Sequence, residues 1–311
     1  MQIYILFILN VFILTFLGSF TENIRNSRFF EYIILLSIII ISAFRYNVGW
    51  DYPAYFNLAS SIDPSILFTG ANERIELIPK VLLYISITLK NPYIFFIVSS
   101  LWIIIFLYKG VEKYNINTSY SLFVFSLFPI FLMQSFGIIR QFMAISAGFY
   151  FTSDFILKNN KIKFVSGILL SLLCHRSAIM LIFVLPLLFI INKVRISRIS
   201  TYISILSVEI FLLIINETLA TGLSGFLKNI LPLVGLGYYS YAVNFMATLG
   251  GQKWVYLNVM ISIVLLFFLK NRKLRHDNIF YISSIFFLIG TIAEILLTPF
   301  GHSGLRLALY Y

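Results

Sequence analysis

Four arginines at the ends of apolar segments carry the chemistry of anion binding. Arg45 follows one apolar run, Arg140 opens another, Arg176 stands beside His175 in a short turn, and Arg306 lies near the end of the sequence. A guanidinium binds phosphate oxygens bidentately, and in a water-poor site it stabilises the charge that develops on a departing diphosphate. The four arginines therefore favour a transfer reaction with a diphosphate leaving group.

Such a reaction also needs a base to deprotonate the acceptor hydroxyl, and two residues are candidates. The unperturbed pKa of a histidine is about 6.5 and that of an aspartate about 3.9, so His175 is the first choice and Asp51 the second. Each has another explanation: Asp51 can cap a helix that begins at Tyr52 and Pro53, and His175 can hydrogen-bond a free carbonyl in its turn. The sequence contains no Asp-x-Asp pair and no histidine cluster for Mg²⁺, so we expect a metal-independent reaction without a cofactor.

The segments that must position these residues have the composition of a membrane protein. Hydrophobic residues make up 60% of the 311, charged residues only 11%, and the mean hydropathy is +0.94. A soluble domain is excluded, because it would carry about 25% charged residues. One span needs about 20 apolar residues, so we predict an all-α polytopic fold with about ten transmembrane helices in a single integral membrane domain, 1–311. We place the spans at 3–20, 29–44, 93–108, 118–135, 141–157, 162–174, 177–192, 199–215, 254–269 and 278–297.

One apolar segment, Leu77–Lys90, is too short for a span. Its 14 residues make a helix of about 21 Å, less than the roughly 30 Å hydrocarbon core, and it contains Pro79 and Lys80. We predict a short re-entrant or interfacial helix there. Two loops, Arg45–Glu76 and Asn216–Lys253, are long enough to be functional, although their aromatic residues are equally typical of a belt at the headgroups.

The net charge of +11 follows the positive-inside rule, which favours a membrane protein over a nucleic-acid binder. Basic residues cluster in short loops at 158–163, 193–198 and 270–275, which we predict to be cytoplasmic. Two topologies are compared: in one the short segment does not cross the membrane, and in the other it crosses and the first two spans are flipped. Both place the same number of basic residues inside, so charge alone does not choose between them. If the segment does not cross, the outer face holds Arg45, Arg140, His175, Arg176, His302 and Arg306.

Charges at span ends are functional candidates by default, because they are costly unless paired or facing a cavity. For Arg140 the alternative is snorkelling to the interface. We interpret Glu76, which opens the short helix, as solvated, with the alternative that it faces the cavity.

Four blocks of residues occur in one order along the chain, and together they resemble the EpsG/Wzy type of polysaccharide polymerase over about residues 30–311. The blocks are Arg45-x-x-Val48-Gly49-x-Asp51-Tyr52-x-x-Tyr55, Arg140-Gln141-x-x-Ala144, His175-x-Ser177-Ala178 and Arg306-x-x-x-Tyr310. The resemblance implies a membrane glycosyltransferase of type C architecture in the bacterial inner membrane. Its active site would face the periplasm and polymerise undecaprenyl-diphosphate-linked repeat units of lipopolysaccharide O-antigen or capsule.

The resemblance and the residue chemistry together define the expected site and partners. We expect His175, Asp51 and Arg140 to be catalytic. We expect the substrate to be bound by Arg45, Arg176, Arg306, Gln141, Tyr55 and Tyr310. The expected partners are undecaprenyl-diphosphate-linked oligosaccharides, membrane lipids and a chain-length regulator, with no nucleic acid.

Two other functions fit a polytopic chain with a basic cavity. A glycolipid transporter or flippase would suit the same substrate, but its ionisable residues would descend through the midplane and no inverted repeat is visible. An O-antigen ligase performs similar transfer onto lipid A core, and only the set of blocks favours a polymerase. The resemblance also implies further spans beyond the last block, so we expect a chain truncated at its C-terminus.

Overall fold

The structure is a computed structural model that describes residues 2–20, 24–114, 116–128, 131–183, 198–215, 229 and 252–297. Every element in this described part is a helix, as predicted. The chain divides into two compact units, Met1–Leu181 and Ile182–Tyr311. The residues expected to do chemistry in the described part all lie in the first unit.

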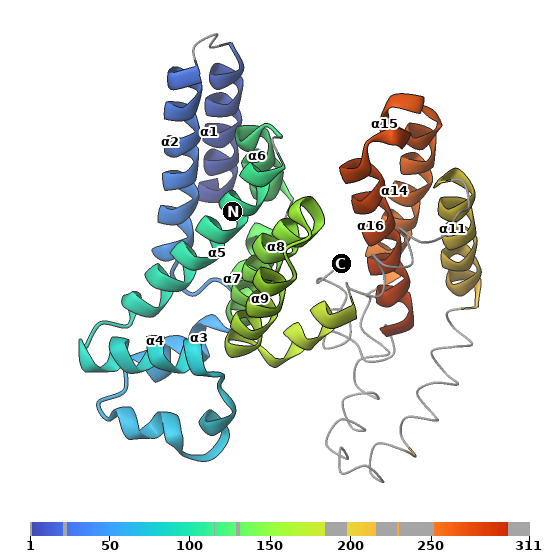
Figure 1. Cartoon of the computed structure of the whole chain (residues 1–311). Coiled ribbons are helices and arrows are strands. Elements are labelled where there is room, and N and C mark those ends of the chain that lie inside the picture. Colours follow the sequence, from blue (N-terminus) through green and yellow to red (C-terminus); the bar gives the residue numbers. More distant parts are fainter. Residues whose placement is uncertain are drawn as a thin grey trace. The chain divides into compact units, whose positions relative to one another are not determined.

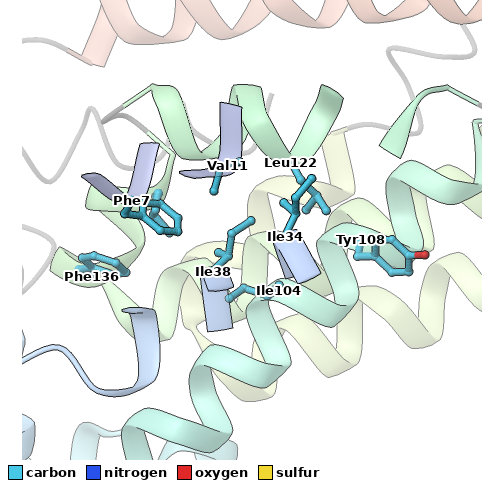
Figure 2. Packing of buried hydrophobic residues seen from close by; sticks show 9 residues of the cluster. Phe7, Val11, Ile34, Ile38, Ile104, Tyr108, Leu122 and Phe136 are labelled. Atoms are coloured by element: carbon cyan, nitrogen blue, oxygen red, sulfur yellow. The ribbon is translucent and has the colours of Figure 1, made fainter. Parts of the chain in front are cut away.

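The first unit begins with long apolar helices packed side by side (Figure 1). These are α1 (Gln2–Ser19), α2 (Ile24–Ala43), α5 (Tyr93–Lys113) and α6 (Thr118–Leu127). The core that they share with α7 (Leu132–Gly137), shown in Figure 2, consists of Phe7, Val11, Ile34, Ile38, Ile104, Tyr108, Leu122, Leu132 and Phe136. Large apolar side chains such as Phe12 and Ile40 instead point outward and are half exposed, which is the arrangement a lipid-facing surface requires.

An antiparallel helix pair completes the first unit. Helix α8 (Ile139–Lys158) packs on α9 (Lys161–Cys174) and on α5. Asn159 ends α8 in the left-handed conformation with φ 50°, and the Asn160 side chain accepts a hydrogen bond from the Lys163 N–H to start α9. Gly167 allows the close approach of the two helices, since a Cβ there would lie 2.2 Å from the Phe151 Cβ.

The long loop Arg45–Glu76 contains helical structure of its own. It holds α3 (Tyr52–Ala59) and two short 3₁₀ helices, η1 (Pro64–Phe68) and η2 (Gly70–Arg74). Helix α4 (Leu77–Thr88) follows, and its 12 residues span about 18 Å. The predicted short helix is therefore confirmed, and Figure 1 shows it lying crosswise to α1 and α2.

The predicted span 118–135 is two helices. Helix α6 ends at Leu127, and α7 (Leu132–Gly137) begins separately. The reason is local: Phe128 precedes Pro129 in the sequence, and the proline ring disfavours helical backbone in the residue before it. Phe128 accordingly adopts an extended conformation with ψ 116°.

In the second unit α11 (Arg198–Ile214), α14 (Gln252–Lys270) and α16 (Asn278–Leu297) pack on one another, with the short α15 (Arg272–His276) before α16. They match three predicted spans.

The 3₁₀ helix η3 (Arg176–Phe183) covers the start of the predicted span 177–192, whose remainder lies outside the described residues. The loop Asn216–Lys253 also falls almost wholly outside them.

Length and composition allow two of the described helices, α5 and α16, to cross a bilayer unaided. Apolar helices with shorter described stretches are also present, among them α1 and α14. The structure thus agrees with a helical membrane protein, while the predicted number of about ten spans is not confirmed.

Candidate functional site

Arg45 is the most deeply buried of the predicted site arginines that the structure describes. It is only 7% exposed, its Nη1 donates to the Ser42 carbonyl, and its Cζ lies 5.2 Å from the Phe96 ring centroid and 4.7 Å from that of Phe136. Burial lowers the pKa of Arg45 to about 10, against the opposing charge of Asp51. Within the described part of the chain its buried Nε has no hydrogen-bond partner, so one donor of this guanidinium lacks an acceptor.

The first block of the motif docks on the residues just before the second. The Asp51 N–H donates to the Gly137 carbonyl at 3.2 Å, three residues ahead of Arg140. Gly49 has φ +103°, and a Cβ there would lie 2.1 Å from the Phe136 carbonyl oxygen. Only glycine permits both this backbone conformation and this approach. The glycine of the motif therefore brings Asp51 to the start of α8.

Asp51 precedes α3 but does not cap it. It stands at the cap position with a proline just inside the helix, as the capping explanation requires, yet its side chain makes no capping hydrogen bond. The helix is held instead by aromatic packing: the Tyr52 ring stacks on Phe96 at 4.6 Å and the Tyr55 ring on Phe95 at 4.8 Å. The packing of these rings, and not a side-chain cap by Asp51, therefore holds the start of α3.

Arg140 forms an ion pair that the sequence interpretation did not predict. Its Nη1 lies 2.5 Å from Glu76 Oε2, and the side chains are 26% and 8% exposed respectively. Its Cζ stands 5.8 Å from the Tyr55 ring centroid, and its buried Nε has no hydrogen-bond partner among the described residues. Arg140 is therefore held inside the protein by a carboxylate and a ring, so snorkelling does not explain its position.

Tyr55 supports this arginine from a buried position. It is 5% exposed, and burial raises the pKa of its phenol well above the usual value despite the nearby Arg140 charge. The phenol is consequently neutral at physiological pH. A neutral hydroxyl beside a guanidinium does not cancel the positive charge that an anion would meet.

Glu76 also binds the third block. Its Oε1 accepts a hydrogen bond from the Arg176 backbone N–H at 3.1 Å, while the Arg176 side chain is exposed. The solvated interpretation of Glu76 is therefore wrong, because its side chain is only 8% exposed and both carboxylate oxygens have partners. The sequence did hold one signal for the burial of Glu76: this residue directly precedes a short helix that contains a proline.

His175 ends α9 in an extended conformation at the same turn. The Ser177 N–H donates to its Nδ1 at 3.1 Å, and the Ser177 hydroxyl lies 2.7 Å from the same atom. The ring thus accepts a backbone N–H through Nδ1. An Nδ1 that accepts places the proton of neutral His175 on Nε2.

The structure brings together most of the predicted site residues that it describes. Arg45 and Asp51 join Arg140 through the docked first block, and Glu76 links Arg140 to the turn of His175 and Arg176. Gln141 is 2% exposed in the first turn of α8. Arg306 and Tyr310 lie outside the described residues.

A second charged group lies at the other end of α8. Asp154 Oδ2 lies 2.6 Å from the Lys113 Nζ and 4.0 Å from the Lys163 Nζ. Helix α8 has 20 residues, or about 30 Å, so it separates this lysine-rich end from the arginines by about the thickness of a hydrocarbon core.

The sequence matches the family model of the EpsG family over residues 28–311. Neither a curated protein nor a solved structure matches the chain.

Proposed function

Because the chain belongs to the EpsG family, the family of Wzy-type polysaccharide polymerases, we propose that it polymerises undecaprenyl-diphosphate-linked oligosaccharide repeat units on the periplasmic face of the inner membrane. The acceptor hydroxyl attacks the anomeric carbon of the donor glycan and forms the new glycosidic bond. The bond from that carbon to the diphosphate oxygen breaks, and undecaprenyl diphosphate leaves with the electron pair. The hydroxyl proton passes to a base of the protein.

The observation that carries this proposal is the pair of guanidinium groups with incomplete hydrogen bonding. Arg45 and Arg140 each have a buried Nε without an acceptor in the described part of the chain. Buried donors are almost always satisfied, so this pattern favours an anionic ligand at the site. A diphosphate supplies several acceptor oxygens and the negative charge that two cations would stabilise as it leaves.

The base is one of the two predicted residues, and the tautomer of His175 favours Asp51. With the Ser177 N–H on Nδ1, neutral His175 carries its proton on Nε2 and can donate a hydrogen bond there, but it cannot accept a second proton at that atom. Asp51 does not serve as a helix cap, and its backbone N–H is bound to the Gly137 carbonyl, just before Arg140. We therefore assign proton removal to Asp51 and hydrogen-bond donation to His175.

Metal independence is part of the proposal, because guanidinium groups take the place that Mg²⁺ has in many reactions of diphosphates. Polymerisation by the purified protein should continue in the presence of excess EDTA. Loss of activity on chelation, with recovery on adding Mg²⁺, would contradict this part of the proposal.

The test of the function is polymer formation from purified lipid-linked repeat units by the full chain in proteoliposomes. The wild-type protein should give a ladder of glycan lengths. Arg140→Ala should abolish the ladder when polymer is compared at equal amounts of folded protein, and Arg140→Lys should restore little of it, because an ammonium lacks the planar fork. Arg272→Ala is the matched control, since Arg272 is exposed in α15 and should tolerate the change.

Two other outcomes would replace the proposal. Movement of lipid-linked units across the bilayer without a new glycosidic bond would indicate a flippase. Transfer of preformed glycan onto lipid A core, without chain growth, would indicate a ligase.

A further inference from the structure

Glu76 connects two blocks of the motif although it belongs to neither. We propose that Glu76 is a positioning residue of the transfer reaction, which directs the Arg140 guanidinium toward the leaving diphosphate and holds the turn that carries His175. This inference rests on the proposed polymerase function, because it assigns Arg140 to the diphosphate.

Both carboxylate oxygens of Glu76 have fixed partners. Oε2 lies 2.5 Å from the Arg140 Nη1, 64 residues away in the sequence, and Oε1 accepts the Arg176 N–H, 100 residues away. The Glu76 side chain is 8% exposed. The ion pair between Lys109 and Glu112 differs, because its side chains are 52% and 44% exposed and lie one turn apart on α5. A solvated pair of that kind contributes little, whereas breaking a buried pair leaves a charge without its partner.

The position of Glu76 at the start of α4 does not explain its conformation. It occupies the residue before the helix, with an extended backbone at ψ 163°, but its side chain makes no capping hydrogen bond. The carboxylate points to the two other blocks instead. Its function therefore concerns those blocks and not the stability of the helix it precedes.

The contact restricts which donors Arg140 can offer to a ligand. Glu76 occupies Nη1, the Tyr55 ring lies 5.8 Å from Cζ, and Nε remains a buried donor without a partner in the described part of the chain. A guanidinium held at two places cannot rotate freely, so the N–H bond of its unused Nε points in one fixed direction. Donors fixed in this way stabilise developing charge without reorganising during the reaction.

Glu76 is not a second candidate for the base. Each of its oxygens already accepts a hydrogen bond, one of them from a cation. Proton removal would require it to leave Arg140 at the moment when Arg140 is needed. Its effect on the reaction therefore passes through Arg140 and through the turn at His175.

The substitution Glu76→Gln tests this role because it keeps the length of the side chain and removes its charge. Steady-state rates are measured with purified lipid-linked repeat units and the folded full chain isolated by size exclusion. We expect kcat to fall by about 10- to 100-fold with little change in KM, since misdirecting a catalytic group mainly affects the transition state. Glu76→Asp keeps the charge but has a shorter reach, so its kcat should lie between those of Glu76→Gln and wild type.

Glu112→Gln is the matched control, because it removes a glutamate from an exposed ion pair on α5, and its kcat should equal that of wild type. A purely structural role of Glu76 would lower the amount of folded protein and leave kcat per folded molecule unchanged. That result would overturn the inference.

A double substitution shows whether Glu76 acts through Arg140. In the Arg140→Lys background, Glu76→Gln should have a much smaller effect on kcat than in wild type, because the fork it directs is gone. Equal effects in both backgrounds would overturn the inference. Absence of any polymer from wild-type protein would instead contradict the proposed function, so the two failures are distinguishable.

Discussion

At the scale of single residues, the two arginines with orphaned Nε atoms differ in how their charge is balanced. Arg140 has Glu76 as a direct partner, whereas Arg45 is surrounded by the rings of Phe96 and Phe136 and the carbonyl of Ser42. Ring faces and a carbonyl attract a cation without neutralising it. Arg45 therefore has no ion-pair partner in direct contact among the described residues, and its protonation should govern the alkaline limit of activity.

The pH dependence of Arg45 follows from its lowered pKa of about 10. The folded protein holds this proton less tightly than the unfolded chain does. Burial of the charged form therefore lowers the free energy of unfolding below about pH 10, and this loss is relieved as the pH rises through 10. Anion binding has the opposite dependence, since it is lost when Arg45 becomes neutral. We expect kcat/KM to fall above about pH 10 in wild type. In Arg45→Lys the fall should begin at lower pH, because lysine starts from about 10.4 before the same burial. An unchanged pH profile in Arg45→Lys would exclude Arg45 as its cause.

The base is also decided by single residues. Asp51→Asn should lower kcat by about 10² to 10⁴, the usual cost of losing a positioned base, while the KM for the glycolipid stays similar. His175→Gln should cost much less, because glutamine still offers an N–H donor. Both rates are measured with purified lipid-linked units. A large loss of kcat in His175→Gln together with a near-normal kcat in Asp51→Asn would reverse the two roles. Long glycan chains from both variants would mean that neither residue is the base and that the arginines act mainly by stabilising the leaving group.

At the scale of elements, the site depends on how the loop after α2 docks on the start of α8. The docking contact is the Gly49 backbone against the Phe136 carbonyl, followed by the Asp51 N–H on Gly137. Residues that bind no substrate can therefore control the distance between Arg45 and Arg140.

Gly49→Ala should disturb this docking. The alanine Cβ would meet the Phe136 carbonyl oxygen at 2.1 Å and would also occupy φ +103°, a strain of roughly 1–3 kcal/mol before the clash is counted. Thermal unfolding in detergent should show a clear loss of stability, and polymer formation should fall with it. Gly70→Ala is the control: its φ is +56° and no atom lies within 4 Å of the added Cβ, so it should cost only about 1 kcal/mol. Equal melting temperatures for the two variants would contradict this account.

At the scale of the whole molecule, the first unit has an arginine end and a lysine end. Arg140 begins α8, while Lys158 ends it near the ion pairs of Asp154 with Lys113 and Lys163. Basic loops are retained in the cytoplasm, so the cluster at the end of α8 is consistent with the proposed periplasmic orientation of the site, which labelling has to test.

Cysteine labelling tests that orientation in a Cys174→Ser background. Single cysteines at Trp50, which is 84% exposed, and at Gly235 should react with an impermeant maleimide from the periplasmic side. Cysteines at Lys161 and Leu274 should react only after permeabilisation. Cys174 itself is buried, which makes wild-type protein a suitable unlabelled reference. Labelling of Leu274 from outside would reverse the orientation, and labelling of Trp50 only after permeabilisation would support the flipped first two spans.

The sequence by itself determined the all-helical class and the family. Long apolar runs specify helices such as α5 and α16, which are long enough to cross a bilayer, because each helix satisfies its own backbone hydrogen bonds. The shortness of α4 follows from the length of its apolar segment. The order of the four motif blocks along the chain was also enough to indicate the family whose model residues 28–311 match. Even the break between α6 and α7 had a local signal in Pro129, which the hydropathy of the segment concealed.

Only the tertiary structure decided which of these residues meet. Glu76 had the appearance of a solvated loop residue, yet it pairs with Arg140 and with the Arg176 N–H across 64 and 100 residues. The Gly49 conformation likewise has its reason in a carbonyl on another helix. Helix formation depends on neighbours within one turn, but a side-chain partner depends on how helices pack, and apolar runs that all face lipid or core carry little information about that packing.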